Sequence, residues 1–163
     1  MRWPSLGALV GAVLAAAAAA AEPNADLVAP IQKFVDSFNQ GDMAAAAATH
    51  ATTDVSIIDE FPPYLWRGAQ ALETWSADLA SDAKKRGITD QKVEIGRPTR
   101  EELAGDHAYV VVPAVYTFKE GGTAMREEAQ FVFALRKGSG GWLIHGWAWT
   151  GPKPSPTGAL QER

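Results

Sequence analysis

The sequence predicts an α+β fold in which three N-terminal helices pack on a curved antiparallel sheet. Helical periodicity is confined to the first half of the chain, whereas the second half consists of runs rich in β-branched and aromatic residues. Glycine-containing turns separate these later runs, as expected for strands that pair in the order in which they follow one another. Helices then segregate from strands, and one domain of ordinary size accounts for the whole pattern.

Residues 1–21 have the composition of a secretory signal peptide. Arg2 is their only charged residue, residues 6–21 are all apolar or glycine, and the stretch ends in alanines, which fits cleavage after Ala21. This apolar run is shorter than the roughly 20 residues that a membrane-spanning helix needs. We therefore expect a mature domain over 22–151 that is periplasmic or secreted and has no membrane segment.

Composition argues against several classes of partner. The net charge is −4, and removal of the leader takes away only Arg2, so the mature chain is more acidic still. Its lysines and arginines are scattered, which disfavours nucleic acid and anionic membrane surfaces as partners. The chain contains no cysteine, so disulfides cannot stabilise it and packing alone must do so.

Three helices are expected in the first half. Apolar residues recur at helical spacing over 27–38, and Gly41 ends this helix. Asp42 is suited to cap a second, alanine-rich helix over 43–49 through its carboxylate. The third helix, over 69–86, also ends at a glycine.

The remaining runs are expected to be strands. One short strand precedes the third helix, and four longer runs follow it; the predicted strands are 52–58, 90–98, 107–118, 124–137 and 142–149. The tail over 152–163 contains three prolines and little that is apolar, which predicts disorder. A curved sheet closed by helices forms a cone, and the open end of a cone is a natural pocket for a small molecule.

Four sequence motifs, in the order in which they occur, together resemble one family. They are "FNQGD" at the end of the first helix, "VSIIDE", "WRG", and "GWLIHGWAW" in the last strand. Over residues 26–151 the chain resembles the NTF2-like superfamily, in particular its SnoaL-like and ketosteroid-isomerase-like branch. The resemblance implies a cone-shaped, cystatin-like α+β barrel. It also implies a wide choice of functions, because this scaffold hosts isomerases, dehydratases, cyclases, binding modules and transport factors.

The resemblance assigns a role to Asp59. In ketosteroid isomerases a catalytic aspartate stands ten positions, counted inclusively, from a loop glycine, and Asp59 to Gly68 has this spacing. That family also uses two hydrogen-bond donors that stabilise the enolate, and their counterparts here are Phe34 and either Phe131 or Val132. None of these has a donor, and loss of one such donor commonly costs about 10²–10³ in rate. Ketosteroid isomerase chemistry is therefore disfavoured.

The segment "IIDEFPPYLWRG" carries the main catalytic candidate, Asp59. If the segment is extended, the side chains of Asp59 and Glu60 point to opposite sides and only one of them faces the cavity. Burial of Asp59 among aromatic side chains would raise its pKa toward values useful for a general base. The alternative is that Asp59 or Glu60 pairs with Arg67 or begins a surface loop.

Strand alternation suggests a partner for Asp59. His145, Trp147 and Trp149 would share one face of the last strand, which makes His145 the second catalytic candidate; the alternative is a packed core face with His145 at an exposed end. His107 is expected to be solvated. The predicted ligand-binding side chains are Phe34, His50, Tyr64, Trp66, Trp75, Tyr116, Trp147 and Trp149. His50 could instead interact with the end of its helix.

We expect neither a metal nor a cofactor. The three histidines are 57 and 38 residues apart, without a metal-binding spacing, and no glycine-rich phosphate loop precedes a helix. Charged residues over 125–128 begin a strand and would form a solvated face. With Tyr116, Phe118 and Phe131 nearby, that face could also serve a homodimer.

The sequence leaves two main functions open. The first is an exported binding module that holds a small apolar or aromatic molecule against some of its six tryptophans. The alternative is a cofactor-free isomerase, dehydratase or cyclase with Asp59 as general base and a histidine as acid. A protein-interaction module is a further alternative, favoured if side chains fill the cone.

Overall fold

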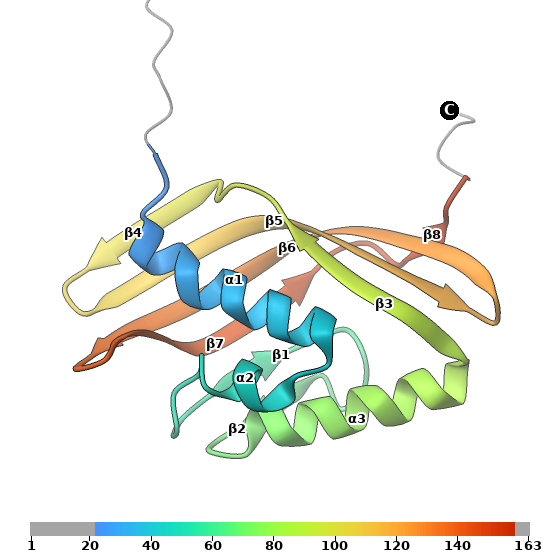
Figure 1. Ribbon diagram of the computed structural model, residues 1–163, viewed down its shortest axis with the longest axis horizontal. Helices are drawn as coiled ribbons and strands as arrows, with labels where there is room; N and C mark the ends of the chain where they lie inside the picture. The colour runs from blue at the N-terminus through green and yellow to red at the C-terminus, as the bar shows by residue number, and fades with distance from the viewer. Residues whose placement is uncertain (1–21, 159–163) are drawn as a thin grey trace, which may run out of the picture.

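Three helices lie on the concave side of a curved sheet. The computed structural model describes residues 22–158, so the predicted signal peptide and residues 159–163 lie outside the described residues. The helices are α1 (Ala25–Gln40), α2 (Met43–Ala47) and α3 (Ala71–Arg86). In Figure 1, α1 runs beneath the sheet and α3 lies further from it, along the opposite side of the molecule. No helix within residues 22–158 is long and apolar enough to span a membrane.

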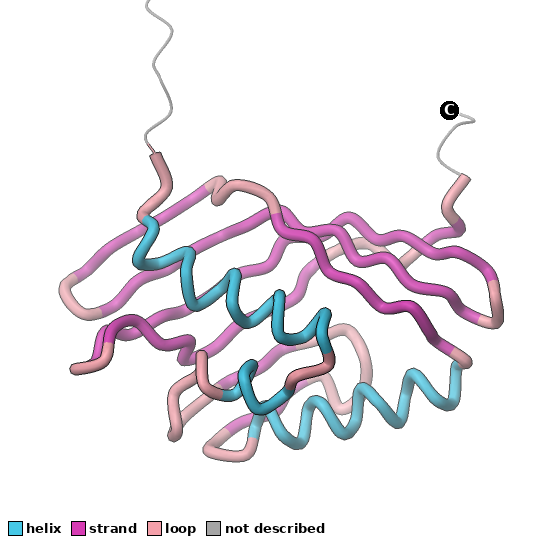
Figure 2. Tube along the Cα trace, in the orientation of Figure 1, coloured by secondary structure: helices cyan, strands magenta, loops and turns pink. Residues whose placement is uncertain are grey.

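The sheet is mixed, in contrast to the antiparallel sheet that the sequence predicts. Its main path runs β2-β1-β7-β6-β5-β3 (Figure 2). Among the named strands of residues 22–158, β1 and β7 form the parallel pair. Strands β5, β6 and β7 pair in the order in which they follow one another, and β1, which comes before α3 in the chain, joins this group beside β7. The strands are β1 (Ser56–Ile58), β2 (Leu65–Arg67), β3 (Ile88–Ile95), β4 (Arg100–Ala104), β5 (His107–Glu120), β6 (Thr123–Gly138), β7 (Gly141–Thr150) and β8 (Ser155–Pro156).

Helix α1 is capped at both ends. The Asn24 side chain accepts a hydrogen bond from the Asp26 backbone N–H at 3.1 Å, and Gly41 ends α1 with φ of 71°.

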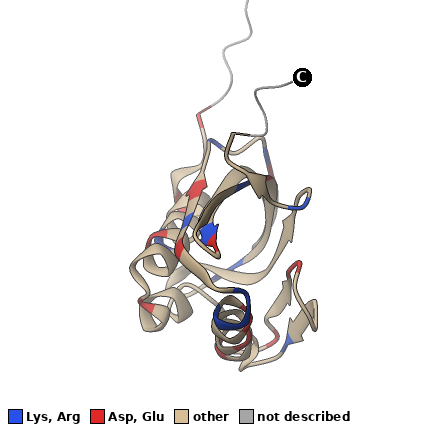
Figure 3. Ribbon diagram, turned by 90° about the vertical axis from the view of Figure 1, so that its right-hand side faces the viewer, with Lys and Arg blue, Asp and Glu red and all other residues tan. Residues whose placement is uncertain are grey.

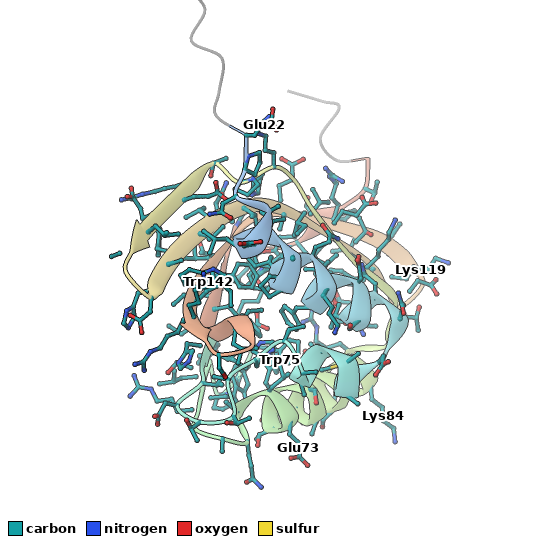
Figure 4. The ribbon with its side chains drawn as sticks, turned by 60° about the vertical axis from the view of Figure 1, so that its left-hand side comes forward. Glu22, Glu73, Trp75, Lys84, Lys119 and Trp142 are labelled. Carbon is teal, nitrogen blue, oxygen red and sulfur yellow. The ribbon has the colours of Figure 1, made fainter. Side chains whose placement is uncertain are left out.

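Helix α3 is amphipathic. Figure 4 shows Trp75 inside the molecule, with Glu73 and Lys84 on the outer side of α3. The face that carries Trp75 therefore covers the concave side of the sheet.

A β-bulge changes the alternation of the last strand. The β6–β7 register shifts where Leu135 pairs with Ile144 and Ala134 pairs with Gly146, so that His145 has no partner. Ile144 and Trp147 are therefore both buried although they are three residues apart. The expectation that His145 shares a face with Trp147 assumed unbroken alternation, and the bulge makes it wrong.

The start of the C-terminal tail is ordered, contrary to the disorder that its prolines predict. Ser155 pairs with Arg126, and the Thr157 backbone N–H donates to the Ala124 carbonyl oxygen at 2.9 Å. Proline is tolerated here because β8 is a short strand that pairs with only the first residues of β6. Lys153 and Pro154 are held beside the concave face as a result.

Close approach of β1 to β7 requires a glycine at position 146. A Cβ atom there would lie 2.7 Å from the Ser56 carbonyl oxygen, which belongs to the paired strand. We predict that Gly146→Ala lowers the free energy of unfolding by about 1–3 kcal/mol, measured by urea denaturation. Gly140→Ala is the matched control, because a Cβ there meets no atom within 4 Å. Equal unfolding energies for the two variants would refute this account of the parallel pair.

Candidate functional site

A cavity of about 380 Å³ lies between α1, α3 and the concave face of the sheet. Its inner walls are aromatic, and they include Phe34, Phe38, Trp75, Tyr116, Phe118, Phe131, Trp147 and Trp149. Arg86, Glu120 and Lys153 line it where α3 and β5 end and β8 begins. This end of the molecule faces the viewer in Figure 3. The cavity is therefore apolar inside and charged at its mouth.

Asp59 is fixed on the cavity wall by two hydrogen bonds. The indole Nε1 of Trp75 donates to Oδ2 at 2.7 Å, and the backbone N–H of Glu60 donates to Oδ1 at 2.8 Å. Burial nevertheless raises the pKa of the Asp59 carboxyl to about 6, because loss of hydration outweighs these two bonds. The carboxyl can thus both accept and release a proton near neutral pH.

Glu60 also lines the cavity, so the expectation that only one of the two acidic side chains faces it is wrong. Strand β1 ends at Ile58, and the chain then bends instead of staying extended. The Tyr64 backbone N–H donates to the Phe61 carbonyl oxygen at 2.9 Å, which closes a tight turn. Alternation applies only to extended backbone, and it therefore fails at this pair.

A third carboxyl group, which the sequence did not single out, belongs to Glu127 on β6. Its side chain faces the concave side with Ala129 and Phe131, and it is 1% exposed. The indole Nε1 of Trp149 donates to its Oε1 at 2.7 Å. The available signal was alternation, which groups Glu127 with Ala129, away from Arg126 and Glu128.

The carboxyl groups of Glu60 and Glu127 interact. Loss of hydration raises the pKa of both, and the negative charge of Glu127 raises the pKa of Glu60 further. Arg86 offsets little of this negative charge. Its guanidinium already pairs with Glu120 at 2.8 Å and with Asp82 at 3.3 Å.

His50 is a structural residue rather than a cavity residue. It is 4% exposed, its Nδ1 lies 2.9 Å from the Ala46 carbonyl oxygen, and its Nε2 accepts from Trp147 Nε1 at 3.2 Å. This pattern fixes a neutral tautomer with the proton on Nδ1. Burial lowers the pKa of His50 to about 4. The prediction of His50 as a ligand-binding residue is corrected accordingly.

Other predicted residues divide between the cavity and its surroundings. Phe34, Trp75, Tyr116, Trp147 and Trp149 line the cavity with Asp59, and His145, Tyr64 and Trp66 do not.

Each residue outside the cavity has a physical reason for its place. His145 lies at the bulge, and Tyr64 is 56% exposed in the turn. Trp66 packs on Phe61, with ring centroids 5.0 Å apart, and donates to Asp78. The predicted pair of Asp59 and His145 is therefore not assembled, since only Asp59 reaches the cavity.

The proposed dimer face is also corrected. Tyr116, Phe118 and Phe131 line the cavity instead of an exposed face of the sheet. Within residues 22–158, no group of three histidine, aspartate or glutamate side chains is arranged to hold a metal ion.

Asp59→Asn should stabilise the protein at neutral pH. The pKa of this acid is about 6 in the folded state and 3.8 as a free side chain. Between these two pH values the folded protein therefore binds more protons than the unfolded protein does. Stability contributed by Asp59 therefore falls as the pH rises through this window. We expect the variant to be more stable by about 1–3 kcal/mol at pH 7, and the difference to disappear below the lower pKa.

Urea denaturation across the pH range measures this difference. His50 acts in the opposite sense, because its lowered pKa makes stability fall as the solution is acidified from pH 6.5 toward 4. That contribution is common to both proteins and cancels in the comparison. Asp36→Asn, at an exposed site on α1, is the control. A difference that does not change with pH would contradict the assignment.

Comparison with known proteins agrees with this architecture. The model of the SnoaL-like domain family matches residues 28–147. No curated protein sequence matches the chain.

Solved structures with the same fold are distant in sequence. A ketosteroid isomerase-like protein from Erwinia carotovora is 22% identical, with 80% of this chain and 96% of that chain covered and a TM-score of 0.61. An NTF2-like superfamily protein from Salmonella enterica serovar Typhimurium is 14% identical, with 82% and 94% covered and a TM-score of 0.65.

A hexachlorocyclohexane dehydrochlorinase of type 2 is 13% identical, with 82% of this chain and 93% of that chain covered and a TM-score of 0.65. At such identities these likenesses describe the fold alone. The family model matches most of the chain, and the chain therefore belongs to the SnoaL-like domain family.

Proposed function

We propose that the protein binds a small, uncharged and mainly apolar molecule, aromatic or alicyclic, in the cavity between α3 and the sheet. The observation that carries this proposal is the cavity itself, about 380 Å³ in volume and walled by aromatic side chains. A folded domain that needed these side chains only for its core would fill this space. The predicted signal peptide further supports a periplasmic or secreted location.

The charges around the cavity select against anionic ligands. Carboxyl groups outnumber cations on its lining, which contains Asp59, Glu60, Asp82 and Glu120 against Arg86 and Lys153. A carboxylate ligand would meet this negative field after losing its own hydration, which is costly. A neutral ring system would instead gain contact with the aromatic walls.

Tryptophan fluorescence tests the binding proposal. We expect 2-naphthol to quench the protein saturably and naphthalene-2-carboxylate, a similar molecule with a charge, to bind at least about tenfold more weakly. Leu79 lines the cavity from α3, so Leu79→Trp should block it. Ala80→Trp, at the adjacent exposed position, should leave binding unchanged. Equal binding to both α3 variants would rule out this cavity as the site.

A second candidate function is proton transfer with Asp59 as the general base. One observation favours it: the Asp59 carboxyl lies on the wall of an apolar cavity, and burial raises its pKa to about 6. A base with such a pKa is about half ionised near pH 6 and can both take and return a proton. The bond from Trp75 Nε1 holds the carboxyl in place, with lone pairs left for a substrate.

Hydrogen–deuterium exchange measures this activity without knowledge of the natural substrate. The probe is 2-tetralone, an uncharged bicyclic ketone with acidic C–H bonds beside its carbonyl group. We expect the protein to accelerate uptake of deuterium from D₂O, followed by NMR, and Asp59→Asn to lose about 10²-fold or more of this rate. Retained 2-naphthol binding in the variant would show that its cavity is intact. Equal exchange rates would exclude Asp59 as the base.

A further inference from the structure

The hydrogen-bond donors on the cavity lining decide which polar groups of a ligand can be satisfied. Four neutral side chains of this lining, which belongs to the described part of the chain, carry an N–H or O–H group: Trp75, Tyr116, Trp147 and Trp149. Arg86 and Lys153 are charged donors and belong to the mouth. The direction in which the four neutral donors point therefore determines what a ligand meets on the inner walls.

Two of the indole N–H groups are bonded to carboxyl groups of the protein. Trp75 Nε1 donates to Asp59 Oδ2 at 2.7 Å, and Trp149 Nε1 donates to Glu127 Oε1 at 2.7 Å. Glu127 is 1% exposed, so its bond with Trp149 is sheltered from solvent. An indole has a single N–H and no other donor, and both rings consequently offer a ligand only their carbon surfaces.

The third indole N–H, that of Trp147, is bonded to a buried histidine. Trp147 Nε1 donates to His50 Nε2 at 3.2 Å. His50 can accept this bond only while it is neutral, and burial lowers its pKa to about 4. Its Nδ1 lies 2.9 Å from the Ala46 carbonyl oxygen, which places the remaining proton there. His50 thus keeps the Trp147 N–H away from a ligand at neutral pH.

The hydroxyl group of Tyr116 also donates within the protein. Its hydrogen bond to Gln91 Oε1 is 2.6 Å long. Gln91 lies in a bulge of β3, because the β3–β5 register shifts between Thr89 and Lys92, and such bulges redirect side chains. With its hydrogen given to Gln91, the Tyr116 oxygen has only lone pairs left for a ligand.

The carboxyl groups on the lining add further acceptors. Each oxygen of Asp59 takes one N–H, from Trp75 or from the Glu60 backbone, and keeps lone pairs. Glu60 also lines the cavity. The pKa is about 6 for Asp59 and about 7 for Glu60, so both groups are largely ionised at pH 8 and then only accept.

We infer that the ligand of this cavity is a neutral ring compound that carries a hydroxyl or N–H donor, and that ring compounds with acceptors alone are selected against. The inference rests on the binding function proposed above and names its ligand class. A phenol or cyclic alcohol would bond a free lone pair of Asp59, whereas an ether or ketone would lose its hydrogen bonds to water without replacement.

The same pattern favours binding over the second candidate function for carbonyl substrates. An enolate oxygen is stabilised by donors aimed at it. The four neutral donors of the lining are bonded elsewhere, to Asp59, Glu127, His50 and Gln91.

Three ligands with one ring system test the inference by tryptophan fluorescence at pH 8. 2-Naphthol carries a donor, 2-methoxynaphthalene carries only an acceptor, and 2-ethylnaphthalene has the size of the ether without a polar atom. We expect 2-naphthol to bind at least about tenfold more tightly than the ether, although the ether is more apolar. An ether that binds as tightly as 2-naphthol, or more tightly than 2-ethylnaphthalene, would reveal a free donor and overturn the inference.

Asp59→Asn tests the group that accepts the ligand's donor. The asparagine amide keeps an acceptor for Trp75 and adds an N–H donor. We expect this variant still to bind 2-naphthol, but its preference for 2-naphthol over the ether should fall at least about tenfold. Asp36→Asn, at an exposed site on α1, should keep the wild-type preference. The same preference in both variants would also overturn the inference.

Gln91 is a positioning residue, because it acts on the ligand through Tyr116. Gln91→Leu frees the Tyr116 hydroxyl, and we expect the ether to bind about three- to tenfold more tightly. Gln91→Glu retains an acceptor and should restore the wild-type affinity. Gln130→Leu, the same change at an exposed position of β6, is the matched control. Equal ether affinity in the two leucine variants would refute the role of Gln91.

The outcomes separate this inference from the proposal on which it rests. If none of the three ring compounds binds, the binding function fails and the ligand class fails with it. If all three bind with similar affinity and Leu79→Trp blocks them, the cavity remains the binding site and the requirement for a donor alone is rejected.

Discussion

The hydrogen bond from Trp75 Nε1 to Asp59 Oδ2, 2.7 Å long, joins helix α3 to the loop that follows β1. The same indole packs edge-on against Trp147 of β7, with ring centroids 5.0 Å apart. One side chain thereby fixes the helix over the concave face, forms part of the cavity wall and orients the carboxylate. The geometry of the site depends on this contact, because it holds the Asp59 carboxyl directly against α3.

The apolar walls and the acidic groups have opposite effects on stability. Phe34, Phe131 and Trp147 form one aromatic cluster with Trp75, and their burial stabilises the fold. That same apolar environment disfavours ionisation of Asp59. A carboxyl group in such an environment costs stability, and such costs are typical of functional sites. The site and the core are therefore parts of one layer of side chains.

Much of the fold could be predicted from the sequence because its signals are local. Helical spacing, the glycines that end α1 and α3, and the long β-branched runs correspond to α1, α3 and the strands β5 to β7. The short strands β2, β4 and β8 could not be predicted, since two to five residues carry little periodicity and β8 exists only through its pairing with β6. The parallel pair of β1 and β7 depends on contacts between distant segments, which local patterns do not encode.

The site could be predicted in part for the same reason. The resemblance to ketosteroid isomerases singled out Asp59, and strand alternation grouped Trp147 with Trp149; all three line the cavity. The prediction that His145 faces the cavity was wrong because one bulge residue shifts the alternation of β7. The prediction that Asp59 and Glu60 point to opposite sides was wrong because the chain bends directly after β1. Glu127 was missed because a charged residue at a strand start is usually solvated, and only the three-dimensional fold shows that Trp149 covers it.

The central claim is that a neutral ring occupies the cavity beside Asp59, and a crystal structure of the mature protein with 2-naphthol tests it most directly. The account predicts ring density between Trp75, Trp147 and Phe131, with the naphthol hydroxyl within hydrogen-bonding distance of the Asp59 carboxyl. Density instead at the separate depression lined by Gly96 and Pro113 would contradict it, as would a cavity that stays empty at saturating ligand.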